Sequence, residues 1–173
     1  MDIILNIETS SDMCSVAMTS GGGVLIEKRE ERGMNHAKVL APFIEECMNY
    51  LANHDQKLSA VAVSIGPGSY TGLRIGLSTA KGICFGKDIP LIGISTLEII
   101  AVSAMFRKYD WEGDELLVPM LDARRMEVYT GVYDFALNPI IQPQPHILSE
   151  ESFKEYLDKG KLYFMGNGSI KAM

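Results

Sequence analysis

The chain has 173 residues, 47% of them hydrophobic and 22% charged, and its net charge is −6. That length suits one large domain or two small lobes, and the acidic balance without a basic cluster argues against direct binding to nucleic acid. Cys14, Cys47 and Cys84 lie far apart, so neither a zinc site nor a disulfide framework is expected. The start lacks the basic segment of a signal peptide, and no apolar run reaches the roughly 18 residues of a membrane span. These features predict a soluble, cytoplasmic protein with buried, reduced thiols.

The first part of the chain predicts strands and helices in the order βββαβαβα. Strands are expected at residues 3–7, 14–19, 24–30, 60–65 and 90–94, and helices at residues 36–53, 71–86 and 96–108. Pro42 lies inside the first helical pattern, so that helix is expected to kink there or to begin near it. Because the later strands alternate with helices beside an antiparallel hairpin, this order is typical of a ribonuclease H-like lobe, the building block of the actin/hexokinase class.

The second part of the chain repeats features of the first. Two expected strands end in an acid before a small residue, at Glu8 and at Asp122. Two turns of the form Gly-x-Gly-Ser follow apolar strands, at residues 66–69 and 166–169. The repeat predicts an α/β protein of duplicated lobes.

The two lobes are expected over residues 1–108 and 109–173. The second should contain a strand over 142–148 and a helix over 149–159 with Ser149 as its cap. It stops four residues after its Gly-x-Gly-Ser turn, whereas the first continues through a helix, a strand and another helix. The second lobe is therefore expected to be incomplete, because the chain is a fragment or because this lobe is reduced.

The turn after the first strand lies where an actin-fold enzyme holds phosphate and metal. Such enzymes use Asp and Gly there, so that the backbone can approach the phosphate closely. This turn has Glu8 and no glycine, and the turn at Asp122 also lacks one. Three interpretations stay open: residues that cap a hairpin, a degenerate remnant, or a working phosphate site. The candidate residues of such degenerate phosphate loops are Glu8, Thr9, Ser10, Asp122, Gly166 and Gly168.

The segment GPGSYTG, residues 66–72, runs from a strand into a helix. Its free N–H groups could hold an anion, but no lysine follows where a Walker A loop requires one. A structural turn with Ser69 or Thr71 as the helix cap is favoured. His36 has only Leu40 on the next helical turn, so no metal site is predicted.

The helix predicted at 71–86 carries an unusual set of glycines. Four of them fall on one arc of the helix: Gly72, Gly76, Gly82 and Gly86. Each costs about 1 kcal/mol relative to alanine in a helix interior, whereas small residues allow another helix to approach closely. We interpret the arc as a protein–protein interface, so Gly76→Leu is expected to stay folded and to lose dimerisation. The alternative is that the arc is internal.

The longest specific motif is SIGPGSYTGLRIGLSTAKGICFG, which is followed by PLIGISTLE. The segment IETSSDMCSVA precedes it and LDARRMEVY comes later. Together these segments closely resemble the TsaB (YeaZ) family, the subunit of bacterial tRNA threonylcarbamoyladenosine biosynthesis that is sometimes labelled glycoprotease-like. The resemblance spans essentially the whole chain, and the central block is its specific part.

The resemblance implies an actin-like ATPase fold in a pseudoenzyme that has no catalytic residues, cofactor or metal of its own. It implies the catalytic subunit TsaD and the ATPase TsaE as partners, a homodimer in isolation, and contact with tRNA only through the complex. It places the partner interface on the first two helices. It also implies that TsaD has a pair of metal-binding histidines in its helix, whereas this sequence has only His36 at that place. The interface residues expected from the helices and the arc are Val39, Phe43, Cys47, Gly72, Ile75, Gly76, Thr79, Ala80 and Ile83.

Two other functions compete with this scaffold role. An active actin-fold kinase or ATPase is disfavoured by Glu8 and by the turns without glycine. A metallopeptidase of the glycoprotease type is disfavoured because the second histidine is missing. Weak nucleotide binding in a degenerate cleft is compatible with the scaffold role. We expect that the pure chain neither hydrolyses ATP nor binds tRNA alone at physiological salt.

Overall fold

A five-stranded sheet organises the first half of the chain in this computed structural model, which describes residues 1–31, 35–108, 110–157 and 160–172. The chain divides into two units, Met1–Ser95 and Thr96–Met173. The strand order in the first unit is β3-β2-β1-β4-β5. Its strands are β1 (Ile3–Glu8), β2 (Cys14–Ser20), β3 (Gly23–Glu30), β4 (Ala60–Ser64) and β5 (Leu91–Ile94).

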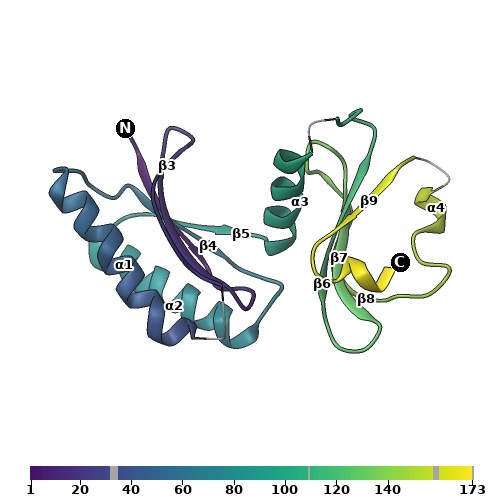
Figure 1. The fold of residues 1–173 in the computed structure, drawn as a ribbon, viewed down its shortest axis with the longest axis horizontal. Helices are drawn as coiled ribbons and strands as arrows, with labels where there is room; N and C mark the ends of the chain where they lie inside the picture. The colour runs from purple at the N-terminus through teal and green to yellow at the C-terminus, as the bar shows by residue number, and fades with distance from the viewer. Residues whose placement is uncertain (32–34, 109, 158–159, 173) are drawn as a thin grey trace. The chain divides into compact units, whose positions relative to one another are not determined.

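Two helices, α1 (His36–Asn53) and α2 (Tyr70–Lys87), cover one face of this sheet (Figure 1). α1 packs on β2 and β3, while α2 packs mainly on β4. α1 begins before Pro42, so the expectation that it starts near that proline is wrong. Each predicted element of this unit agrees with the structure within one residue at either end.

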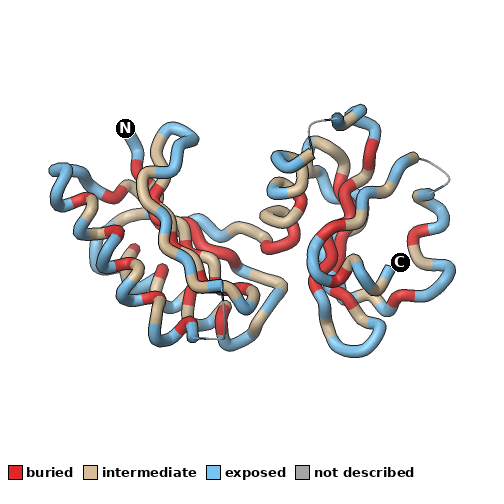
Figure 2. The backbone as a smooth tube through the Cα atoms, in the orientation of Figure 1, coloured by how far each residue is buried: buried red, intermediate tan, exposed pale blue. Residues whose placement is uncertain are grey.

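Alternation along the strands decides which side chains form the core of the first unit. In β1, Ile3, Leu5 and Ile7 are buried beneath the helices, and the residues between them are half-buried. Every residue of β4 is buried, as expected for a central strand, and β4 pairs in parallel with both β1 and β5. Figure 2 shows this buried centre in red along the strands.

The second unit repeats the order of the first in a four-stranded sheet, β8-β7-β6-β9. In both units an antiparallel meander is joined to a parallel strand, because β6 pairs antiparallel with β7 and parallel with β9. The predicted internal repeat is therefore confirmed in topology. Its elements are α3 (Thr96–Arg107), β6 (Leu116–Asp122), β7 (Glu127–Tyr133), β8 (Pro139–Ile147), α4 (Lys154–Leu157), β9 (Leu162–Met165) and the 3-10 helix η1 (Ser169–Ala172).

The boundary between the units differs from the one expected after residue 108. Leu97 and Ala101 of α3 are fully buried against Leu117 and Leu121 of β6. Because α3 completes the core of the second sheet, the division falls at Ser95.

The helix expected over residues 149–159 is wrong in its extent. The structure has a turn followed by the four-residue α4, and residues 158 and 159 lie outside the described residues. The turn is closed by Ser152, whose Oγ accepts from the Ser149 N–H at 2.9 Å, so Ser149 is not a helix cap. Phe153 has φ +65° and its side chain is buried in the second core. That backbone conformation interrupts a right-handed helix.

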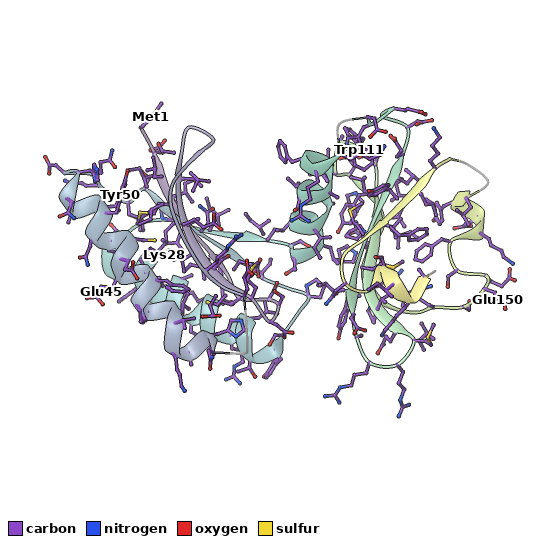
Figure 3. The ribbon with its side chains drawn as sticks, viewed as in Figure 1. Met1, Lys28, Glu45, Tyr50, Trp111 and Glu150 are labelled. Atoms are coloured by element: carbon purple, nitrogen blue, oxygen red, sulfur yellow. The ribbon has the colours of Figure 1, made fainter. Side chains whose placement is uncertain are left out.

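A loop after α3 is closed by the buried carboxylate of Glu115. Its two oxygens accept from the N–H groups of Glu112, at 3.0 Å, and Gly113, at 2.8 Å, and Lys108 Nζ lies 3.7 Å away. The same Lys108 Nζ lies 4.4 Å from the ring centroid of Trp111, which is labelled in Figure 3. Hydrogen bonds from the backbone N–H groups hold the pKa of Glu115 below its ordinary value of 4.5. The bond from Glu112 has the largest effect, and the bond from Gly113 adds to it.

Glu115→Gln should therefore change how stability depends on pH. A depressed carboxylate pKa stabilises the fold above the unfolded value, and this contribution is lost as the pH falls through the folded pKa. The variant should melt at a lower temperature than the wild type at pH 7, and the difference should shrink below about pH 4.5. Thermal melts monitored by circular dichroism at both ends of this range test this. An equal difference at pH 7 and pH 3 would show that the charge is unimportant.

Two smaller expectations can be compared with the structure. The three cysteines are free and buried, as predicted. Within the described parts of the chain, no helix combines the length and the apolar character needed to cross a membrane.

Candidate functional site

The turn after β1 is stabilised by hydrogen bonds to the carboxylate of Glu8, the last residue of that strand. Glu8 Oε1 accepts from the Ser10 N–H at 2.6 Å and from Ser64 Oγ, at the end of β4, at 3.0 Å. Thr9 is fully buried and Ser10 nearly so. The Ser10 N–H is thus bonded to Glu8, and it is not a free donor for a phosphate. This arrangement is the one expected of residues that cap a hairpin.

Three glycines let the start of α2 approach this turn closely. A Cβ on Gly68 or on Gly72 would lie within 3.0 Å of a carbonyl oxygen of the turn, that of Ser10 or that of Thr9. A Cβ on Gly76 would lie within 3.0 Å of Thr9 Oγ1. Real Cβ atoms essentially never come so close, so the turn requires glycine at these places.

Ser69 is the N-cap of α2, which confirms one of the two predicted caps. Its Oγ accepts from the Gly72 N–H at 3.2 Å, and its own N–H donates to the Ser10 carbonyl at 2.7 Å. Two donors at the start of α2 are therefore bonded within the unit. Such internal bonding supports the structural interpretation of GPGSYTG over an anion site.

The corresponding turn in the second unit is held by different groups. The Asp122 N–H donates to Asn167 Oδ1 at 2.9 Å, and Lys171 pairs with the Asp122 carboxylate. A Cβ on Gly166 or Gly168 would come within 3.0 Å of the backbone of β6. These glycines therefore allow close backbone packing, as Gly68 does in the first unit. The six candidate phosphate-loop residues divide evenly: Glu8, Thr9 and Ser10 lie in the first unit, and Asp122, Gly166 and Gly168 in the second.

His36 and Cys14 are two further side chains of the first unit, and the structure gives each a structural environment rather than a reactive one. His36 is buried, with Nε2 3.3 Å from the Met13 carbonyl oxygen. Burial, and then the nearby Glu8 carboxylate, raise the pKa of the Cys14 thiol to about 11. That thiol is therefore protonated and a poor nucleophile at neutral pH.

The structure separates the nine predicted interface residues into two groups. Cys47, Gly72, Gly76 and Ala80 are buried within the first unit. Cys47 and Ala80 belong to the hydrophobic core of this unit, whereas Gly72 and Gly76 pack against Thr9 in the turn after β1. Each of the four thus has a packing role within the first unit, and their contact with a partner stays a prediction. The half-buried group keeps part of its surface accessible and consists of Val39, Phe43, Ile75, Thr79 and Ile83.

The other two glycines of the predicted arc have a different environment. Gly82 and Gly86 are exposed, and a Cβ on either would meet no atom within 4 Å. Phe85, between them, is 93% exposed. We define the outer face of α2 as one arc of its surface, given by the helical period, consisting of Thr71, Ile75, Ser78, Thr79, Gly82, Phe85 and Gly86. The sequence analysis included both glycines in the predicted interface arc but did not include Phe85. The one feature of the sequence that could have identified Phe85 is its position between these two glycines.

A family model described as "TsaD: tRNA N6-adenosine threonylcarbamoyltransferase" matches residues 9–146. The TsaB protein of Bacillus subtilis is 34% identical over 157 residues, which cover 88% of this chain and 66% of that protein. The TsaB protein of Escherichia coli is 35% identical over 130 residues, 75% of this chain and 54% of that protein. The chain belongs to this family, in its TsaB (YeaZ) group.

The solved structure of YeaZ from Pseudomonas aeruginosa matches with a TM-score of 0.67 at 28% identity, over 88% of this chain and 69% of that one. This likeness, together with the repeated sheet order, confirms the actin/hexokinase-like fold class. The chain spans between about half and two thirds of the length of the curated TsaB relatives named above.

Proposed function

We propose that the chain is a non-catalytic scaffold subunit in the synthesis of threonylcarbamoyladenosine on tRNA. In this role it binds the catalytic subunit, a TsaD-type threonylcarbamoyltransferase, and an ATPase of the TsaE type joins them in the cytoplasm. The names of its TsaB relatives support the pathway, and the matching family model carries the name of the transferase itself. The chain contacts tRNA only as part of this complex.

The outer face of α2 is the observation that carries the proposal. Gly82 and Gly86 lower helix propensity by roughly 1 kcal/mol each in a helix interior, and less near its end. A Cβ at either position would meet no atom within 4 Å beyond its own stretch of helix. Gly72 and Gly76 have an internal reason to be glycine, whereas these two have none in the first unit. A helix of a partner that approaches closely over Gly82 and Gly86, beside the exposed Phe85, gives them one.

The hairpin bonds of Glu8 support the non-catalytic part of the proposal. Its carboxylate is engaged by Ser10 and Ser64, and the buried glycines place α2 directly on the turn. An ATPase or kinase of this fold would need that turn for phosphate and metal. The same outer face of α2 would pair two copies when the catalytic subunit is absent, so a homodimer in isolation is part of the proposal.

Reconstitution with the catalytic subunit tests this proposal. The full chain, co-expressed with a TsaD-type transferase, should elute with it from a sizing column. Threonylcarbamoyladenosine should form on a tRNA transcript only when this chain, the transferase and the ATPase are all present. The chain alone should release no phosphate from ATP. Steady ATP hydrolysis by the chain alone, abolished in Glu8→Gln, would show instead that it is an active nucleotide-dependent enzyme.

A further inference from the structure

A hairpin joins β6 to β7 (Figure 1). Two adjacent arginines, Arg124 and Arg125, lie in its turn, between the end of β6 at Asp122 and the start of β7 at Glu127. Arg124 and Arg125 are both exposed. Within the described ranges, neither forms an ion pair with an acidic side chain. Their charge is thus available to a ligand, in a chain whose net charge is −6.

The base of this hairpin is firmly held. The Ala123 N–H donates to the Glu127 carbonyl at 3.1 Å, and the Glu127 N–H donates to the Arg124 carbonyl at 3.2 Å. Lys171 Nζ, from η1, donates to the carbonyls of Ala123 and Glu127 and pairs with Asp122. The lysine charge is therefore used inside the unit, while the two arginines lie exposed at the tip of a hairpin whose base is hydrogen-bonded.

The backbone at Arg125 favours another residue. Its φ is +61°, at the first central position of the turn that the Glu127 N–H closes. Glycine adopts such a conformation without the strain that a side chain brings. An arginine is held there at some cost in backbone energy, as are four other non-glycine residues of the described chain, so the conformation supports a functional hypothesis only together with the exposed charge.

We infer that Arg124 and Arg125 bind backbone phosphates of the RNA substrate in the assembled complex. This inference rests on the proposed function, in which an acidic subunit works beside a polyanion and gains from local positive charge where the RNA passes. Guanidinium groups bind phosphate oxygens in pairs of parallel hydrogen bonds, which makes arginine well suited to this contact. Two contacts are too few for the isolated chain to hold RNA, and they add to those of the partner.

Salt-dependent binding of an unmodified tRNA transcript to the complex of this chain with the catalytic subunit tests the inference. Arg125→Gly relieves the backbone strain, so it should leave the melting temperature of the chain unchanged or raise it. It should nevertheless weaken tRNA binding about tenfold near 0.1 M salt and reduce the slope of log affinity against log salt by about 1. The double variant Arg124→Gln/Arg125→Gly should reduce the slope by about 2.

Arg107→Gln is the matched control, because Arg107 is an exposed arginine at the end of α3. It should leave the slope unchanged. A double variant that assembles and binds tRNA with the wild-type slope would overturn the inference alone. So would a double variant that no longer assembles, because the arginines would then contact an acidic protein surface. A wild-type complex that fails to bind tRNA would overturn the proposed function as well.

Discussion

Gly76→Leu should destabilise the protein by about 1–3 kcal/mol or more, in the manner of an overpacked core. Even the first atom of the new side chain would lie within 3.0 Å of Thr9 Oγ1. Thr9 is fully buried in the turn that Glu8 holds, so it has little room to move. Urea denaturation of the purified variant measures the effect as a lower midpoint with an unchanged slope.

Gly82→Leu is the matched control on the same helix. A side chain there meets open space, and leucine is a better helix former than glycine, so stability should stay the same or rise by up to about 0.8 kcal/mol. The two glycines are six positions apart in one element, so this comparison isolates their surroundings. Equal stability of the two variants would contradict the packing of α2 on the turn.

The glycines of α2 show where sequence reasoning stopped. Their spacing places all four within one broad arc, but hydrophobic periodicity cannot locate a glycine relative to the core, since it carries no side chain. In the structure the buried stripe of α2 consists of Gly72, Gly76, Ala80 and Cys84. Gly82 and Gly86 face outward on the neighbouring side. The arc is thus buried at the edge that holds Gly72 and Gly76 and exposed at the edge that holds Gly82 and Gly86. This distinction depends on contact with the turn at Thr9, which is far away in sequence.

The elements that the sequence predicted well are those with long, regular patterns. The strands β1 to β5 and the helices α1 to α3 have clear periodicity and turns rich in glycine, so their limits followed from local chemistry. The limits of the segment after β8 did not follow from local chemistry. Phe153 has a positive φ and is buried beside Val118 and Met120, and no local sequence pattern predicts this conformation. The assignment of α3 to the second unit likewise depended on burial of Leu97 against β6, a tertiary contact.

Phe85→Glu should weaken binding of the catalytic subunit by about thirtyfold or more, equivalent to at least about 2 kcal/mol, while the chain stays folded. Phe85 is 93% exposed, so the change removes little packing from the first unit. At an interface the same change would bury a carboxylate without a partner and remove an aromatic contact. Isothermal titration of the catalytic subunit with each variant measures the loss.

Phe106→Glu provides the control, because Phe106 is a phenylalanine of α3 that is 77% exposed and lies outside the outer face of α2. It should bind the catalytic subunit like the wild type. Gly82→Leu should behave like Phe85→Glu, since its side chain would hold the partner helix away from the surface without harming the fold. Wild-type affinity in both Phe85→Glu and Gly82→Leu would show that the partner binds elsewhere, and the two exposed glycines would then have no explanation in this surface.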